Sequence, residues 1–324
     1  MRSGSVVTMP LDADTQAFLE KSRSKRGPAP GEMSLEEFRA AVEPFRELGF
    51  EREDVARVDD LTIPREGAGD VALRLYRPDA HGPLPVFVWV HGGSWVRVTV
   101  DLLDNHFRVM ANRSGCAIAA VDYRLSPESR YPEAIEEVYH AAWWLKREAK
   151  PLGLDPDRIG LAGDSSGGNV AAAAAIVDRR RRLVGFAFLA LVLPVLDARF
   201  ESDSWRELGE DYLLTKPQLE WAVEQYAPDA DRDDPLISPV RAPREALEGI
   251  PATRILTGEF DPLKDEGAAF AERLREAGTE VELVEVPGLI HHAMMAPKLL
   301  ETGRDVVVES AEAAGAGLRG NVRA

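Results

Sequence analysis

The sequence predicts an α/β protein in which a mostly parallel sheet carries helices on both faces. From about residue 54 onward, strand-like runs alternate with helical stretches, which is the pattern of parallel strands joined by crossover helices. Several of the strand-like runs, such as 86–90, are apolar at every position, as a strand buried on both faces requires. A length of 324 residues accommodates one large domain of this class.

Eight apolar runs predict the strands of this sheet, at 55–63, 71–76, 86–90, 117–123, 158–162, 186–193, 253–256 and 281–286. Helical stretches separate most of them, at 103–114, 134–150, 168–182, 267–277 and 305–314. Residues 200–235 are rich in charge, aromatics and proline, so we expect a cap insertion between core elements there, with one helix at 216–226. The main α/β domain is assigned to residues 51–324.

The first fifty residues predict helices that precede the sheet. Residues 15–23 form one helical stretch, and Ser34 followed by Glu37 is typical of a helix start. Five apolar residues then recur at helical spacing: Leu35, Phe38, Val42, Phe45 and Leu48. Because this segment precedes every strand, we expect residues 1–50 to lie over the rest of the chain as a helical cap.

The composition excludes several classes of function. The formal net charge of −16 repels phosphate backbones, so we expect no nucleic-acid partner. No apolar run approaches the ~18 residues of a membrane span, and no secretory signal is visible. Cys116 is the only cysteine, which suits a reducing compartment, and we expect a cytoplasmic protein. Neither a metal nor a cofactor is expected, and a homodimer is left open.

Ser165 stands at the most informative position of the chain. It lies between Gly163 and Gly167, after an apolar strand-like run and before an alanine-rich helical run. A tight strand-to-helix turn needs glycines because side chains there would collide with neighbouring backbone, and such a turn holds a serine exposed above a sheet. The pattern predicts that Ser165 is a nucleophile.

A serine hydroxyl needs a base that takes its proton. Of the six histidines, His291 and His292 follow the last predicted strand and a Pro–Gly turn, where a loop can reach back over the sheet. One of these two histidines is the predicted base.

The base must in turn be oriented by a carboxylate. Asp261 precedes Pro262, which can open a helix at its first turn, so Asp261 is expected in the loop at the end of a strand. Asp265 and Glu266 fall inside that first helical turn, where acids are favourable for helix stability alone. We therefore predict Asp261 as the acid of the site.

A second glycine-containing turn, 91–95, directly follows the buried strand at 86–90. Glycines there let main-chain N–H groups approach a substrate carbonyl and stabilise the negative charge that develops on its oxygen. The N–H of Ser166, the residue after the nucleophile, would complete this oxyanion hole. His91 is then expected to organise the loop.

These motifs resemble those of the hormone-sensitive-lipase-like family of α/β-hydrolases, in its bacterial carboxylesterase branch. The resemblance covers nearly the whole chain and rests on the segments 91–95, 122–128 with 131–132, 163–169, 238–239 and 261–267. It implies the α/β-hydrolase fold, with an eight-stranded sheet and a helical cap built partly from the N-terminal residues. It also implies a set of roles: nucleophile Ser165, acid Asp261, base His291, and oxyanion donors on Gly93, Ser94 and Ser166.

The activity that the resemblance implies is hydrolysis of short- to medium-chain acyl esters through an acyl-enzyme, with a small-molecule ester as substrate. Trp95, Met294 and Met295, together with residues of the first fifty, are predicted to shape an apolar pocket. Two alternatives stay open on the same fold: an acyltransferase, deacetylase or lactonase for a specialised metabolite, and a non-catalytic ligand-binding protein.

Three positions depart from the family pattern. Ser94 stands where a third glycine is usual, Val98 stands where a later glycine is common, and His292-Ala293 replaces the usual Gly-Phe pair. A main-chain N–H survives at position 94. The departures therefore concern the pockets rather than the triad, and they favour a specialised substrate.

Overall fold

The computed structural model of the protein describes residues 11–24, 27 and 30–320, so parts of the predicted cap at 1–10, 25–26 and 28–29 lie outside the described residues. Eight strands are present in this part of the chain: β1 (Arg57–Ile63), β2 (Val71–Arg77), β3 (Leu84–Val90), β4 (Ala117–Asp122), β5 (Leu154–Asp164), β6 (Phe188–Val192), β7 (Thr253–Phe260) and β8 (Val281–Ile290). All eight predicted strands are thus confirmed, with ends that differ by a few residues.

The strands form one sheet in the order β1-β2-β4-β3-β5-β6-β7-β8. Strand β2 runs antiparallel to both of its neighbours, and all pairs from β4 to β8 are parallel. The predicted fold class, a mostly parallel eight-stranded α/β sheet, is therefore confirmed. In such a sheet the carboxyl ends of the parallel strands meet at one edge, and ligands bind there.

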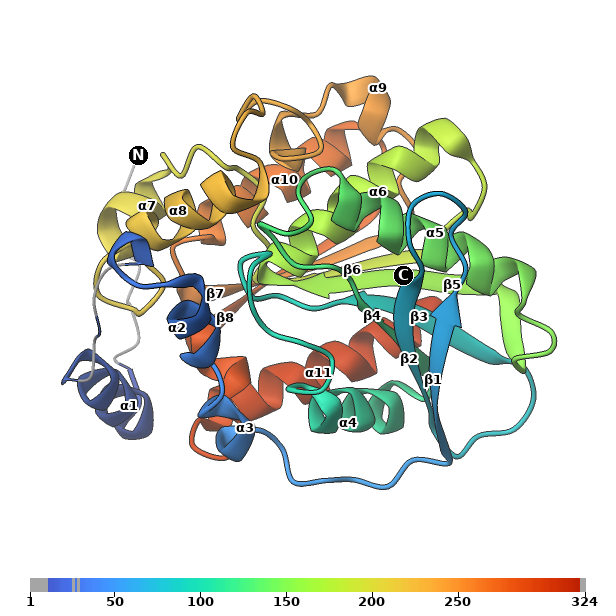
Figure 1. The fold of residues 1–324 in the computed structure, drawn as a ribbon, viewed down its shortest axis with the longest axis horizontal. Helices are drawn as coiled ribbons and strands as arrows, with labels where there is room; N and C mark the ends of the chain where they lie inside the picture. The colour runs from blue at the N-terminus through green and yellow to red at the C-terminus, as the bar shows by residue number, and fades with distance from the viewer. Residues whose placement is uncertain (1–10, 25–26, 28–29, 321–324) are drawn as a thin grey trace, which may run out of the picture.

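Helices cover both faces of the sheet (Figure 1). One face carries α4 (Asp104–Ser114) and α11 (Glu301–Leu318), and the other carries α5 (Glu133–Arg147), α6 (Ser165–Arg181) and α10 (Lys264–Glu276). Successive residues of β3 point to opposite faces, so Val86 and Val88 join one buried cluster while Phe87 and Trp89 join the other. This double burial explains why β3 is apolar throughout.

Short helices gather at the end of the sheet that holds the carboxyl ends of the parallel strands (Figure 1). They are α1 (Ala13–Ser24), η1 (Pro30–Glu32), α2 (Leu35–Ala40), α3 (Phe45–Leu48), α7 (Asp203–Leu208) and α8 (Lys216–Tyr226). The ring of Phe38 in α2 packs against Trp221 in α8, with centroids 4.6 Å apart. Arg23 in α1 donates to the carbonyl of Asp211 at 2.5 Å. The N-terminal segment and the 200–235 segment therefore contact each other.

The single helical face predicted from Leu35 to Leu48 is divided between α2 and α3. Pro44 lies directly before α3, where it lacks an N–H group and its ring would clash with the carbonyl of residue 40 in a continuous helix. The predicted start of this helical segment is correct, because Ser34 and Glu37 form a reciprocal capping box.

Four elements of the structure were not predicted. They are the helices α7 and α9 (Arg244–Leu247) and the turns η2 (Pro239–Arg241) and η3 (His291–Met295).

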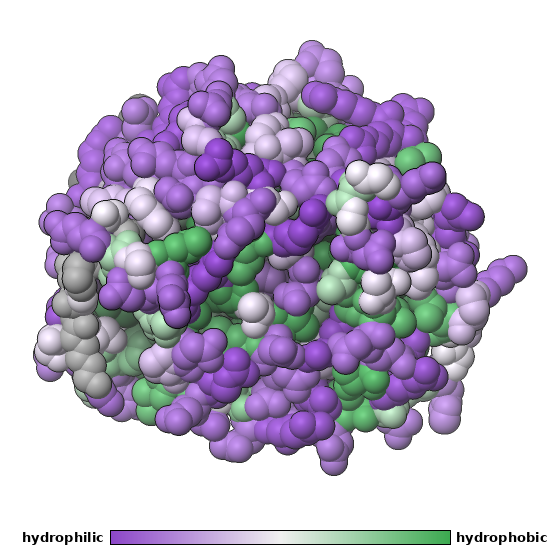
Figure 2. All heavy atoms as spheres, viewed as in Figure 1, coloured by the Kyte–Doolittle hydropathy of each residue, from purple (hydrophilic) through white to green (hydrophobic). Residues whose placement is uncertain are grey.

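Hydrophilic side chains dominate the face of the molecule drawn in Figure 2, and apolar residues show there only in small patches. Among the described helices, none combines the length and the apolar character needed to cross a bilayer.

Candidate active site

Ser165 occupies a sharp turn between the end of β5 and the start of α6. Its φ of +53° lies in the left-handed region, which costs a non-glycine residue about 1–2 kcal/mol. The flanking glycines are required by contact: a Cβ at Gly167 would lie 2.1 Å from the carbonyl oxygen of Val90, and one at Gly163 would lie 2.4 Å from that of Gly167. The turn therefore presents Ser165 half-buried above the sheet, as the glycine pattern predicts.

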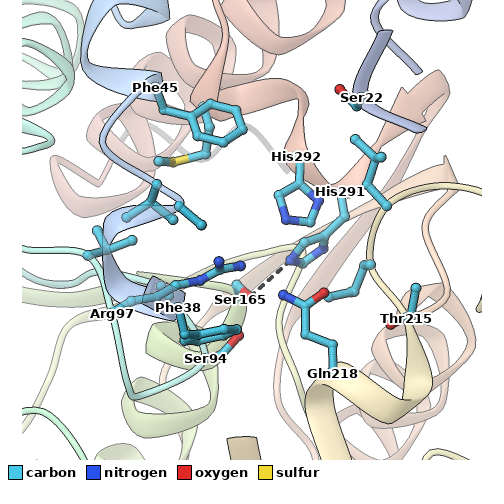
Figure 3. A pocket seen from close by; sticks show the side chains of 18 of the residues that line it. Ser22, Phe38, Phe45, Ser94, Arg97, Ser165, Thr215, Gln218, His291 and His292 are labelled. Carbon is cyan, nitrogen blue, oxygen red and sulfur yellow. Dashed lines mark hydrogen bonds between the residues drawn. The ribbon is translucent and has the colours of Figure 1, made fainter. Parts of the chain in front are cut away.

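Ser165, His291 and Asp261 form a continuous chain of hydrogen bonds (Figure 3). The Ser165 hydroxyl and His291 Nε2 are 2.9 Å apart, and His291 Nδ1 is 2.8 Å from Asp261 Oδ2. Asp261 is fully buried and His291 is 7% exposed. The second carboxylate oxygen of Asp261 accepts the N–H of Leu263 at 3.0 Å. With Nδ1–H donated to Asp261, His291 Nε2 is free to accept the serine proton.

These three residues follow three parallel strands. Ser165 comes after β5, Asp261 directly after β7, and His291 opens η3 directly after β8. Parallel strands bring their carboxyl ends to one edge, so residues far apart in sequence converge there. His292, the other candidate base, lines the same cavity, and its Nδ1 has no hydrogen-bond partner among the described residues. Burial, with His291 and Arg97 nearby, lowers the pKa of His292 well below its ordinary range.

The two acids that follow Asp261 have structural contacts. Asp265 accepts the N–H of Ser204 at 2.8 Å, at the start of α7. Glu266 accepts the N–H of Leu196 at 2.8 Å, and burial raises the pKa of this carboxyl well above its usual value. Neither carboxylate is hydrogen-bonded to His291 among the described contacts.

The 91–95 turn places main-chain N–H groups beside Ser165. The N–H of Gly92 is already bound to Asp164 Oδ2 at 3.0 Å, whereas no described residue accepts a hydrogen bond from the N–H of Gly93 or Ser94. Ser166 lies in the first turn of α6, where N–H groups have no partner within the helix. Among the described residues, the N–H groups without a partner in this turn are thus those of Gly93 and Ser94, whereas that of Gly92 is occupied.

Asp164 fastens this turn to the nucleophile. Besides Gly92, its carboxylate accepts the indole N–H of Trp89 at 3.1 Å, and burial raises the pKa of the Asp164 carboxyl. A Cβ at Gly92 would lie 2.5 Å from Asp164 Oδ2, so only glycine permits this approach. His91 supports the same turn, because its ring stacks on Tyr123 with centroids 4.5 Å apart. This matches its predicted role as loop organiser.

A cavity of about 640 Å³ opens onto Ser165 and His291. Its apolar wall combines the N-terminal segment, the 200–235 segment and the histidine loop: Met33, Phe38, Phe45, Leu213, Met294 and Met295. The predicted pocket residues Met294 and Met295 are thus in the wall. Trp95 is not: it is 1% exposed and stacks on Tyr226 with centroids 4.9 Å apart, behind the cavity. The prediction for Trp95 is therefore wrong.

Residues 87–295 match the model of a protein family described as having the alpha/beta hydrolase fold. The chain belongs to this family. An ethyl acetate hydrolase from Pseudomonas putida is 34% identical over 79% of this chain and 81% of its own length. A carboxylesterase from Mycobacterium tuberculosis is 35% identical over 76% of this chain and 80% of its own length. A solved thermostable esterase from Pseudomonas putida superposes with a TM-score of 0.89 at 33% identity, covering 98% of this chain and 99% of the other.

These relatives confirm the predicted bacterial carboxylesterase branch of the hormone-sensitive-lipase-like α/β hydrolases. The protein is a carboxylic ester hydrolase. Within the described ranges, no group of three or more His, Cys, Asp or Glu side chains is arranged to hold a metal ion.

Two of the three departures from the family pattern, Ser94 and Val98, keep a glycine-like backbone in this α/β hydrolase. Ser94 has a φ of +57° and Val98 a φ of +74°, so both adopt the left-handed conformation that glycine adopts at low cost. For a β-branched residue such as Val98 this conformation is a genuine outlier. The loop conformation is therefore imposed by its surroundings, and the side chains at these positions are added to the cavity wall.

The sequence reasoning missed two residues of the site. Asp164 directly precedes Ser165 in the sequence, and this position is the signal that could have identified it as a residue of the site. Arg97 lines the cavity with its guanidinium carbon 4.3 Å from the centre of the Phe38 ring, and only its proximity to the oxyanion turn hinted at this position.

Proposed function

We propose that this esterase cleaves its substrate through an acyl-enzyme on Ser165. His291 Nε2 takes the proton from the Ser165 hydroxyl while Oγ attacks the ester carbonyl and forms a tetrahedral oxyanion. The intermediate collapses as His291 gives that proton to the leaving alcohol, and Ser165 keeps the acyl group. Water then attacks the acyl-enzyme while His291 takes its proton, and the acid leaves as His291 returns that proton to Ser165 Oγ. Asp261 holds the imidazole in the tautomer these steps need.

The observation that supports these roles is the chain of two hydrogen bonds from Ser165 through His291 to Asp261, at 2.9 and 2.8 Å. The N–H groups of Gly93, Ser94 and Ser166 are proposed as the donors to the oxyanion. Each such donor is worth about 10²–10³ in rate because it is already oriented when the charge develops.

We further propose that the predicted cap, of which the described parts of residues 1–50 and the 200–235 segment are seen, sets substrate size. Side chains of both segments line the cavity, and Phe38 packs against Trp221 across them. The apolar wall and a volume of about 640 Å³ favour short- to medium-chain acyl esters. A series of p-nitrophenyl esters of increasing acyl length tests this: kcat/KM should peak at short or medium chains and fall for long ones.

We also propose a cellular location and an oligomeric state for the protein. A cytoplasmic location agrees with the buried, unpaired thiol of Cys116, and fractionation of cells that express the chain tests it. A homodimer is tested by sedimentation velocity, in which a species of about twice the 35.6 kDa chain mass would be seen.

The proposed mechanism is tested by the Ser165→Ala variant. Its kcat on p-nitrophenyl butyrate should fall by about 10⁶, as for other serine nucleophiles, and labelling by a fluorophosphonate probe should disappear. Ser310→Ala is a matched control, because it removes a buried hydroxyl without a described partner in α11, and it should keep full activity. Turnover by Ser165→Ala above the uncatalysed rate would rule out Ser165 as the nucleophile.

A further inference from the structure

Arg97 places an unpaired positive charge in the wall of the active-site cavity. Among the described residues, no carboxylate lies within ion-pair distance of its guanidinium, and no hydrogen bond leaves its side chain. Its Nε is buried, and none of the residues that the structure describes is its hydrogen-bond partner. The face of the Phe38 ring lies against the charge, with its centre 4.3 Å from the guanidinium carbon.

An arginine in this condition is unusual. Removing a guanidinium from water without a carboxylate or hydrogen-bond partner is costly, and proteins usually pair such groups. Burial lowers the pKa of Arg97 to about 10, so the group is still charged at neutral pH. The overall charge of the chain is −16, and carboxylates that could pair with an arginine are abundant elsewhere on it. The free charge at Arg97 is therefore a local feature of the cavity.

Arg97 lines the same cavity as Ser165 and His291. Arg97 belongs to the oxyanion turn, with its N–H bound to the carbonyl of Gly93 at 3.0 Å. Figure 3 shows its side chain extending into the cavity toward Ser165, with Phe38 on one side and His292 across the cavity. His292 adds a second polar atom without a partner, Nδ1. A substrate held at Ser165 would thus meet one cation and one imidazole near its ester group.

We propose that Arg97 binds a carboxylate carried by the substrate, so that the preferred esters are anionic. The guanidinium provides two parallel N–H donors that match a carboxylate, and binding supplies the partner that the folded chain lacks. His292, when its proton is on Nδ1, donates to the same group. The carboxylate is either on the acyl side, as in a half-ester of a dicarboxylic acid, or on the alcohol side, as in an O-acylated hydroxy acid. This inference rests on the esterase activity and adds the substrate class.

A purely structural role makes a different prediction. If Arg97 served only to pack on Phe38 and hold the cap, its loss would affect neutral and anionic esters equally. The deciding quantity is therefore the ratio of kcat/KM for an anionic ester to that for its uncharged isostere, measured in the same protein.

Two substrate pairs measure this ratio, with acid release followed in a pH-stat. Monoethyl glutarate and ethyl glutaramate differ in charge on the acyl side, and O-acetyl-lactate and O-acetyl-lactamide differ on the alcohol side. The variants are Arg97→Met, which keeps length and removes charge, and Arg97→Lys, which keeps charge and loses the two-donor geometry. We expect Arg97→Met to lower the anion-to-amide ratio by about 10- to 100-fold on at least one pair, mainly through KM. Arg97→Lys should restore part of that ratio.

Binding to the non-turnover variant separates this proposal from the catalytic one. Titration calorimetry of Ser165→Ala with monoethyl glutarate and O-acetyl-lactate, against their amides, reports charge recognition without turnover. The proposal predicts that Ser165→Ala binds an anion more tightly than its amide, and that adding Arg97→Met removes this difference. Such a result supports the proposal even if the assigned nucleophile is wrong. An unchanged anion-to-amide ratio in Arg97→Met on both pairs overturns it. Equal binding of anions and amides by Ser165→Ala overturns it as well.

Discussion

Gly92 and Asp164 join the two glycine-containing turns of the active site through one hydrogen bond. The main-chain N–H of Gly92 donates to Asp164 Oδ2 at 3.0 Å, and Asp164 is the residue directly before the nucleophile. The same bond occupies the Gly92 N–H, while the N–H groups of Gly93 and Ser94 have no hydrogen-bond partner in the described part of the chain. A buried carboxylate thus ties the turn that carries the proposed oxyanion donors to the residue next to Ser165.

Replacing Asp164 by asparagine should loosen this arrangement. The amide keeps one acceptor oxygen and presents an NH₂ group to either Gly92 or Trp89, which leaves one buried donor unsatisfied. We expect kcat on p-nitrophenyl butyrate to fall by about 10- to 100-fold, and the free energy of unfolding to fall by about 1–3 kcal/mol. Steady-state kinetics and urea unfolding of Asp164→Asn measure both effects.

Trp89→Phe is the matched control for this prediction. It removes the other partner of Asp164 and leaves the bond from Gly92, so it should lower stability and change kcat much less. If both variants lost kcat equally, general loosening of the core rather than the Gly92 bond would explain the effect.

The strands and the triad were predictable from sequence because each depends on a local pattern. Strands such as β3 are buried on both faces, so their sequences are apolar at every position. The glycines around Ser165 are required because a Cβ there would collide with neighbouring backbone. The orientation of side chains in the oxyanion turn was not predictable. Positive φ values at Ser94 and Trp95 turn the backbone, and Trp95 then stacks on Tyr226. No local pattern of residue types reports such φ values, so Trp95 was assigned to the cavity and Arg97 was overlooked.

Asp261→Asn should reduce kcat by about 10⁴ with little change in fold. Asparagine would present its NH₂ group to His291 Nδ1 and so favour the tautomer with the proton on Nε2, which cannot accept the Ser165 proton. The measurement is kcat on p-nitrophenyl butyrate, with circular dichroism to compare the folded states.

Asp265→Asn is the control for Asp261. It lies four residues along, and its side-chain oxygen can still accept the N–H of Ser204. Activity close to that of the unmodified enzyme is expected. A loss at Asp265 as large as that at Asp261 would contradict the assignment of a single orienting carboxylate.

Ser94→Gly should stabilise the enzyme. Ser94 has a φ of +57° and its hydroxyl has no hydrogen-bond partner among the described residues, so glycine removes strain without removing a described contact. We expect the free energy of unfolding to rise by about 1 kcal/mol, measured by urea denaturation. Ser94→Ala keeps the strained conformation and should give no such gain. Equal stabilities of the two variants would mean that the backbone at position 94 is not strained.

Acid sensitivity should depend in part on His106. This side chain is buried in α4, its Nε2 donates to the carbonyl of Met294 at 2.9 Å in the loop that carries His291, and burial lowers its pKa to about 4. The unfolded chain binds this proton near pH 6.5 and the folded chain only near pH 4. Stability from this group is therefore complete above pH 6.5 and is lost as the pH falls toward 4, by on the order of 3 kcal/mol.

His106→Gln keeps a donor for Met294 and cannot titrate. The free energy of unfolding of the variant, measured by urea denaturation from pH 7.5 to 4.5, should fall less steeply with acid than that of the unmodified enzyme. The two curves should diverge below pH 6.5, because above that value the histidine is neutral in both the folded and the unfolded chain. Parallel curves over the whole range would show that His106 takes up its proton equally well in both states, and that its burial does not set the acid limit.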